Sequence, residues 1–152
     1  MPETARVLRR FRVVFNAVRR HFQQVERQAG LGGAQVWALS VVDGRPGLGI
    51  GEMAQAMDIH PSTASNLVKA LLQRGLIRMD RLPQDRRSAQ LFIQPPGREI
   101  LARAPGPFEG VLPLALGRLP ADTLARLDAD LEELIVLLQA DEAAGGIPLA
   151  EL

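Results

Sequence analysis

The most informative part of this chain is residues 50–93, which read IGEMAQAMDIHPSTASNLVKALLQRGLIRMDRLPQDRRSAQLFI. Residues 50–57 and 61–74 have helical apolar spacing, and Asp58-Ile59-His60 predicts a tight turn between the two helices. Pro61 suits the first position of the second helix, because its missing N–H would have no helical partner there. A hairpin with a basic tip follows. This order predicts a winged helix-turn-helix, whose second helix enters a major groove of DNA while the hairpin tip reaches the neighbouring minor groove.

The exposed face of the 61–74 helix is small and polar, and no acidic residue occurs from Pro61 to Met79. Small side chains let a helix approach base edges closely, and asparagine can pair with adenine through two hydrogen bonds. A solvated helix face more often mixes glutamate with lysine. A helix pair that simply packs in a core is the alternative interpretation. The residues of this helix predicted to contact DNA are Ser62, Thr63, Ser65, Asn66 and Lys69.

The hairpin is predicted from two strands, at 76–82 and 88–93, with the second strand alternating between apolar and polar residues. The residues between the strands, 82–87, have the composition of a turn, and we expect Asp85, Arg86 and Arg87 to form the tip of the wing. Arginine gains in a narrow minor groove from the focused negative potential, and we expect Asp85 to hold the Arg87 guanidinium in one rotamer. The alternative is an exposed turn with a surface ion pair that contributes about 0–1 kcal/mol.

The composition excludes several kinds of site. Without cysteine, the chain has no disulfide, thiolate zinc site or thiol switch, and its two histidines are too few for a histidine-rich metal cluster. No nucleophile–base–acid set is evident, so we expect neither an enzyme nor a bound cofactor. We expect no secretory signal, and no apolar run approaches the roughly 20 residues that span a bilayer, so we expect a cytoplasmic protein.

The net charge of +1 is unevenly distributed. Residues 61–98 contain seven basic and two acidic residues, a net charge of +5, whereas residues 120–152 contain one basic and eight acidic residues, a net charge of −7. Lys69 is the single lysine, and the other 17 of the 18 basic residues are arginine. This asymmetry indicates that the middle of the chain faces a polyanion and that the acidic end is held away from it.

The flanking segments predict a helical framework around the winged helix. Helices are predicted at 4–28, 34–42, from Pro96-Gly97 to about 104, and at 121–140, where leucines follow a heptad spacing. Three prolines predict a break or sharp kink at 105–107, within the segment 105–113. The final ten residues have no periodicity, and we expect them to be disordered or swapped onto a partner. These segments exceed what a compact winged helix needs, so we expect residues 1–30 and 97–152 to form a dimerisation region around a DNA-binding region at 31–96. The alternative is packing within one subunit.

Six motifs follow one another along the chain: Gln35-Val36-Trp37-Ala38-Leu39, Gly51-Glu52-Met53-Ala54, Ser62-Thr63-Ala64-Ser65, Gly75-Leu76-Ile77-Arg78, Asp85-Arg86-Arg87, and Leu91 to Gly97 with Leu101. In this order they resemble the MarR family of bacterial regulators (multiple antibiotic resistance regulators). In this family, Gly-Leu-Ile/Val follows the second helix of the helix-turn-helix, and Asp-Arg-Arg lies in the wing. The family's usual Leu-Thr before the next helix is replaced here by Ile93-Gln94, and because glutamine caps a helix poorly, the start of that helix is open.

The resemblance implies an obligate homodimer on a palindromic operator, with Asp85 and Arg87 as the wing pair in the minor groove. It also implies a small aromatic or phenolic effector that binds between the dimer helices and the DNA-binding lobe. Arg20, His21 and Trp37 are candidates for that pocket, although His21 can equally be a buried histidine with one hydrogen bond and Trp37 a core residue.

Together these features predict a cytoplasmic, homodimeric and ligand-responsive transcription repressor. Two alternatives come from other classes of protein. One is a dimeric protein-interaction module that uses its winged helix as a protein contact. The other is a small helical enzyme or ligand-binding protein with an incidental basic patch. Strong salt dependence of binding is expected of the DNA-binding protein, because each phosphate contact releases counterions.

Overall fold

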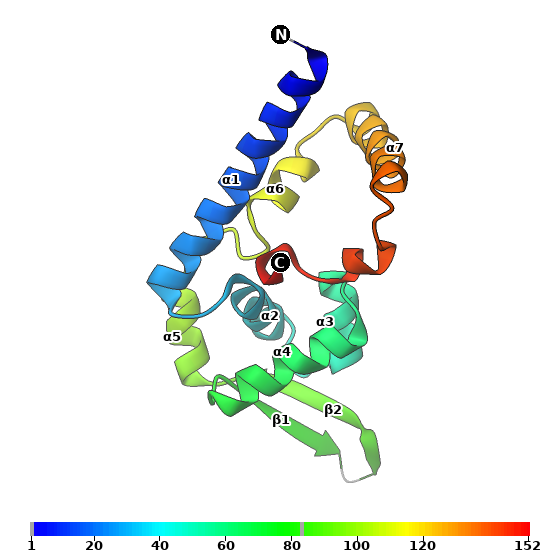
Figure 1. The fold of residues 1–152 in the computed structure, drawn as a ribbon. Helices are drawn as coiled ribbons and strands as arrows, with labels where there is room; N and C mark the ends of the chain where they lie inside the picture. The colour runs from blue at the N-terminus through cyan, green and yellow to red at the C-terminus, as the bar shows by residue number, and fades with distance from the viewer. Residues whose placement is uncertain (1, 83) are drawn as a thin grey trace.

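The computed structural model describes residues 2–82 and 84–152, without the side chains of Leu82, Asp85, Arg86 and Arg87. The described elements confirm a mainly helical fold with one two-stranded antiparallel hairpin, drawn in Figure 1. In chain order they are α1 (Glu3–Ala29), α2 (Gly33–Gly44), α3 (Ile50–Met57), α4 (Pro61–Gln73), β1 (Ile77–Leu82), β2 (Asp85–Ile93), α5 (Pro95–Arg103), α6 (Val111–Gly117), α7 (Ala121–Leu138) and the short 3-10 helices η1 (Glu142–Gly146) and η2 (Leu149–Glu151).

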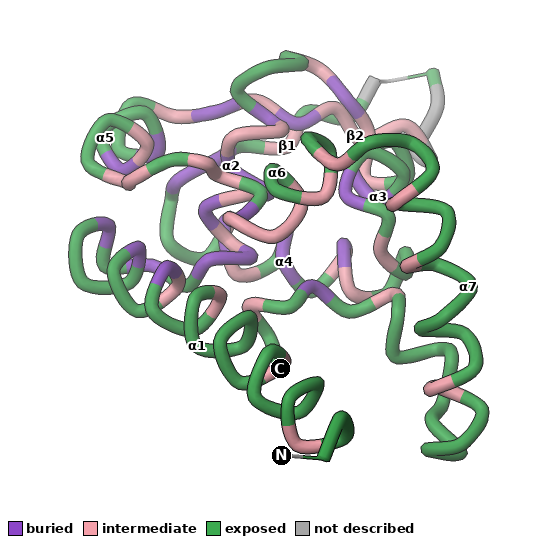
Figure 2. The backbone as a smooth tube through the Cα atoms, turned by 90° about the horizontal axis from the view of Figure 1, so that it is seen from above, coloured by how far each residue is buried: buried purple, intermediate pink, exposed green. Residues whose placement is uncertain are grey.

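The hydrophobic core lies around α2, which contacts α3, α4, α5 and β2. In Figure 2 the buried residues gather in this part of the molecule, whereas α7 and the first half of α1 are largely exposed. The core side chains come from every element that surrounds α2, and they include Val36, Leu39, Val42, Met53, Leu67, Leu71 and Leu91. Burial of this continuous apolar cluster holds the two helices of the helix-turn-helix against the base of the hairpin.

The helix-turn-helix follows the sequence prediction closely. α3 has the predicted bounds, and α4 begins at Pro61. Asp58 ends α3 in the left-handed conformation, with a φ of 52°, which turns the chain sharply toward α4. At the other end of α3, the backbone N–H of Gly49 donates to Oε1 of Glu52 at 3.1 Å, a hydrogen bond that caps the helix.

The hairpin differs from the prediction at its tip. β2 begins at Asp85, not at residue 88, so the backbone of 85–87 belongs to a strand and the turn is shorter than the composition indicated. Leu82 pairs with Asp85, and the register shifts between Arg81 and Leu82. β2 is longer than predicted because its pairing with β1 continues beyond the alternating apolar residues from which the strand was predicted.

The loop after α2 supports the base of the hairpin. The backbone N–H of Gly47 donates to the carbonyl of Leu91 at 2.8 Å, and the N–H of Leu91 donates to the carbonyl of Leu48 at 2.9 Å. These two bonds attach the middle of β2 to the segment that leads into α3. The position of the wing is therefore set relative to the helix-turn-helix by backbone hydrogen bonds.

α5 begins at Pro95, one residue before the Pro96-Gly97 start expected from sequence. The side chain of Gln94 makes no capping hydrogen bond, but two consecutive prolines supply the backbone angles of a first turn. The predicted interruption after this helix is confirmed, and it is a full break, because α5 ends at Arg103 and α6 begins at Val111.

The last residues are ordered and pack on their own chain, contrary to the expectation of disorder or exchange with a partner. η2 contacts α2, and Ala150 lies against the core cluster. Pro148 is buried. The segment lacks helical periodicity because two short 3-10 turns, separated by Ile147 and Pro148, replace a regular helix.

The two long helices at the ends of the fold leave apolar side chains exposed. All 18 residues of α7 are described, and none of them is buried. Figure 1 shows α7 and the start of α1 on opposite sides of the same half of the molecule, away from the hairpin. Within the described residues, no helix combines the length and the apolar character that crossing a membrane requires.

Candidate nucleic-acid interface

α4 places its predicted DNA-contacting residues on the face that does not pack in the core. Ser62, Asn66 and Lys69 are exposed, and Thr63 and Ser65 are half-buried. The opposite side of the helix is fixed by the buried side chains of Ala64, Leu67, Val68 and Leu71. The small residues and the single cation therefore lie together on one accessible helix surface.

The N-terminus of α4 adds favourable electrostatics to this surface. The first turn contains no acidic residue, so the positive end of the helix dipole is not neutralised by a side chain of its own turn. Backbone N–H groups at such a terminus bind phosphate well. This end of α4 can therefore accept a negatively charged backbone beside the polar face.

His60, which precedes α4, bonds to a distant part of the chain. Its Nε2 donates to the carbonyl of Ala143 at 2.7 Å. Its backbone N–H donates to the carbonyl of Gly146 at 3.0 Å. These two bonds tie the start of α4 to the segment that follows α7.

The first strand of the wing contains an arginine, Arg78, that lies over an aromatic ring of the second strand. The Arg78 guanidinium lies 4.5 Å from the centre of the Phe92 ring, and its Nε donates to Oδ2 of Asp80 at 3.4 Å. Arg78 and Phe92 face each other across the hairpin. The signal that could have revealed this stacking is the strand register, which places a cation opposite an aromatic ring.

The predicted wing pair, Asp85 and Arg87, belongs to the start of β2. The side chains of Asp85, Arg86 and Arg87 lie outside the described residues, although their backbone forms the first part of β2. Arg81 lies near the end of β1, opposite Ala89. The arginines of the hairpin thus belong to two paired strands on the same projecting element.

The three residues predicted for an effector pocket are not brought together. Trp37 lines a pocket of about 490 Å³, which is bounded by α1, α2, α3, α6 and the C-terminal segment. Arg20 is exposed on α1 and does not line this pocket. His21 is buried at 8% exposure, and its Nε2 donates to the carbonyl of Pro107 at 3.2 Å.

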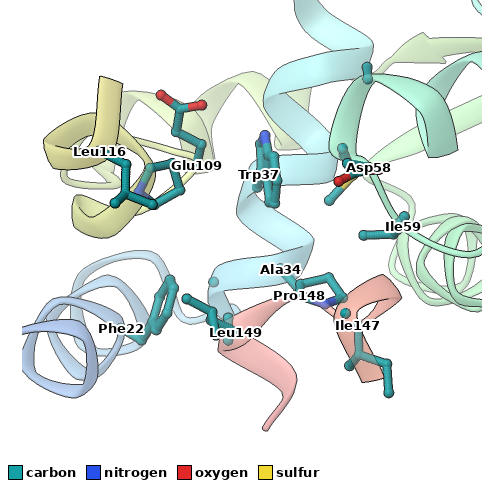
Figure 3. A pocket seen from close by; sticks show the side chains of 16 residues that line it. Phe22, Ala34, Trp37, Asp58, Ile59, Glu109, Leu116, Ile147, Pro148 and Leu149 are labelled. Atoms are coloured by element: carbon teal, nitrogen blue, oxygen red, sulfur yellow. The ribbon is translucent and has the colours of Figure 1, made fainter. Parts of the chain in front are cut away.

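His21 therefore connects α1 to the break between α5 and α6, and its ring lies 5.5 Å from that of Phe22. Phe22 lines the pocket with Trp37, and both rings are labelled in Figure 3. Sequence reasoning missed Phe22, Ile59 and the C-terminal residues of this pocket. Among the described residues, no three histidine, aspartate or glutamate side chains form a group that could hold a metal ion.

Comparison with known proteins gives a family for this arrangement. A model of the MarR family matches residues 29–88, which include the helix-turn-helix and most of the hairpin. A protein from Thauera aromatica, whose name proposes a transcriptional regulatory role for the hcr operon, is 38% identical over 102 residues. The match includes 66% of this chain, and the chain spans 57% of the length of that relative.

Solved structures share most of the fold. A MepR-like protein complexed with pseudoligands matches with a TM-score of 0.61 at 14% identity, over 93% of this chain and 100% of that one. The transcriptional repressor CouR, solved on a 23-mer DNA duplex, matches with a TM-score of 0.54 at 27% identity, over 84% and 87% of the two chains. The family match lies on the helix-turn-helix and wing described above, so residues 29–88 have the winged helix-turn-helix of the MarR family.

Proposed function

We propose that this protein is a sequence-specific, DNA-binding transcription regulator that acts as a homodimer in the cytoplasm. The observation that carries the proposal is the acid-free polar face of α4 beside a hairpin rich in arginine. Asn66 and the small hydroxyl residues would read base edges in the major groove, and Lys69 would contact phosphate. Asp85, Arg86 and Arg87 would form the minor-groove contact of the wing.

Dimerisation is supported by the exposed apolar residues of the first and last long helices. Val13 and Phe15 of α1 are each 66% exposed, and Leu138 of α7 is 65% exposed. We assign residues 1–30 and 97–152 to the dimerisation region and residues 31–96 to the DNA-binding region. A two-fold dimer would hold two copies of α4 about one helical turn of DNA, or about 34 Å, apart on a palindromic operator.

We further propose that the regulator is a ligand-responsive repressor. Bound at a promoter, the dimer would exclude polymerase by steric overlap. A small molecule that binds more tightly to a dimer with the wrong spacing of the two α4 helices would release the operator. Its effect is limited by the difference between its affinities for the two conformations.

Selection from a randomised duplex pool tests the DNA-binding proposal. We expect the full chain to enrich a two-fold-symmetric site, and we expect Arg87→Ala to lose that enrichment because it removes the minor-groove cation of the wing. Arg118→Ala is the matched control, since Arg118 is exposed just after α6 and away from the hairpin. Binding that does not select a sequence, or that is indifferent to Arg87, would contradict the proposal.

Two further variants separate reading of bases from attraction to phosphate. Asn66→Ala should reduce preference for the selected site over random DNA, whereas Arg86→Ala should weaken binding to all duplexes by a similar factor. A protein-interaction module would instead bind its partner with little dependence on salt and would tolerate wing substitutions. A ligand-binding protein with an incidental basic patch would also be indifferent to Arg87→Ala.

A further inference from the structure

The pocket beside Trp37 has a defined chemical character. Its described lining is mostly apolar, and the charged side chains in it are those of Asp58 and Glu109, with no lysine, arginine or histidine. Figure 3 shows these two carboxylates on opposite sides of the Trp37 ring. An aromatic face between two negative charges attracts a cation and repels an anion.

We propose that this pocket binds an apolar molecule that has a positive charge and no negative group. The inference rests on the proposed ligand-responsive regulator and names the chemical class of its effector. A cation at the centre of the pocket could contact the Trp37 face while its apolar groups pack against Phe22, Met57 and Leu116. An aromatic carboxylate would instead bring a third negative charge beside Asp58 and Glu109.

One wall of the pocket comes from the C-terminal segment, residues 141–152. Gly145 and residues 147–150 of this segment line the cavity, and the carbonyls of Ala143 and Gly146 accept the two hydrogen bonds from His60. A molecule in the pocket therefore contacts the same short segment that holds the start of α4. The C-terminal segment therefore connects a molecule in the pocket to the start of α4.

A pair of probes with the same shape and opposite charge tests the inference. Tetraphenylphosphonium and tetraphenylborate are titrated into the full chain without DNA, and binding is followed by the fluorescence of Trp37, the single tryptophan, with calorimetry as a second measurement. We expect saturable binding of the phosphonium cation and at least about fivefold weaker binding of the borate anion, because each carboxylate favours one probe and disfavours the other.

Charge-neutralising variants locate the site. Glu109→Gln should weaken binding of the cation by about 1.5-fold to fivefold, the range for a single partly exposed ion pair. Asp58→Asn should act in the same direction, and asparagine tolerates the left-handed backbone at this position. Glu99→Gln is the matched control, because Glu99 is exposed on α5 and does not line the pocket.

The inference is overturned by equal or tighter binding of the anion, by binding that is insensitive to both pocket substitutions, or by the absence of cation binding. Because the readout needs no DNA, these outcomes are separate from failure of the DNA-binding proposal. Arg87→Ala should keep the affinity for the cation unchanged while it loses operator selection. A chain that binds the cation but selects no duplex would contradict the proposed regulator and leave the ligand class established.

Discussion

Gly97 lies where α5 passes the backbone of Leu76, a residue that follows α4 in the chain. A Cβ atom at this position would lie 2.5 Å from the Leu76 carbonyl oxygen and 2.9 Å from Cγ1 of Ile93. The backbone N–H of Gln94 also donates to that carbonyl at 2.9 Å, so the oxygen is held in place. The close approach of the α5 backbone to the Leu76 carbonyl explains why a glycine occupies position 97.

Gly97→Ala should therefore destabilise the fold, although alanine normally favours a helix. We expect a loss of about 1–3 kcal/mol in the free energy of unfolding, the usual cost of overpacking, measured by urea denaturation. Gly117→Ala in α6 is the control, since its new Cβ meets no described atom within 4 Å, and we expect no loss there. Equal stability of the two variants would contradict the packing argument.

At the scale of single elements, the C-terminal segment (residues 141–152) is held by hydrogen bonds from His60, which is far away in the sequence. Its two hydrogen bonds with His60 join residues more than 80 positions apart in the chain. Gly146 lies directly against the imidazole, and a Cβ added there would be 2.5 Å from Nε2. The segment therefore depends on a glycine at one position and on the histidine that precedes α4.

Gly146→Ala should displace the segment from His60. We expect faster hydrogen exchange over residues 141–152 and a shift in Trp37 emission, because residues 147–150 line the pocket beside that ring. Gly145→Ala is a closely matched control, since a Cβ at Gly145 meets no described atom within 4 Å. Equal exchange protection in the two variants would show that the segment does not depend on this contact.

At the scale of the whole molecule, the two long terminal helices are complementary in charge. α1 contains seven basic and two acidic residues, and α7 contains one basic and five acidic residues. Both helices also expose apolar side chains. A second copy of the chain can cover these faces and pair the opposite charges, which is the arrangement that the proposed dimer requires.

Leu131→Glu should shift the protein from dimer to monomer, because it places a charge in the leucine heptad of α7, where Leu131 is 37% exposed in the single chain. Sedimentation velocity measures the change. Ala129→Glu is the control, since it adds the same charge two residues away on the side of α7 opposite the heptad. A Leu131→Glu variant that remains dimeric would place the interface elsewhere.

Local sequence signals determined most of the secondary structure. Apolar spacing located α3 and α4, Pro61 marked the start of α4, and the prolines after residue 104 predicted the break before α6. These signals act within one or two helical turns, so they can be recognised without knowing the fold. The polar face of α4 followed from the same periodicity, because the buried positions determine which residues remain exposed.

Only the tertiary structure decided which distant groups meet. His21 bonds to the carbonyl of Pro107, His60 bonds to that of Ala143, and the pocket beside Trp37 combines residues from both ends of the chain. The C-terminal segment has no periodicity of its own, so its order comes from contacts with α2 and His60. Local composition specifies a turn or a helix, but a contact between residues 80 positions apart depends on how all the intervening elements pack.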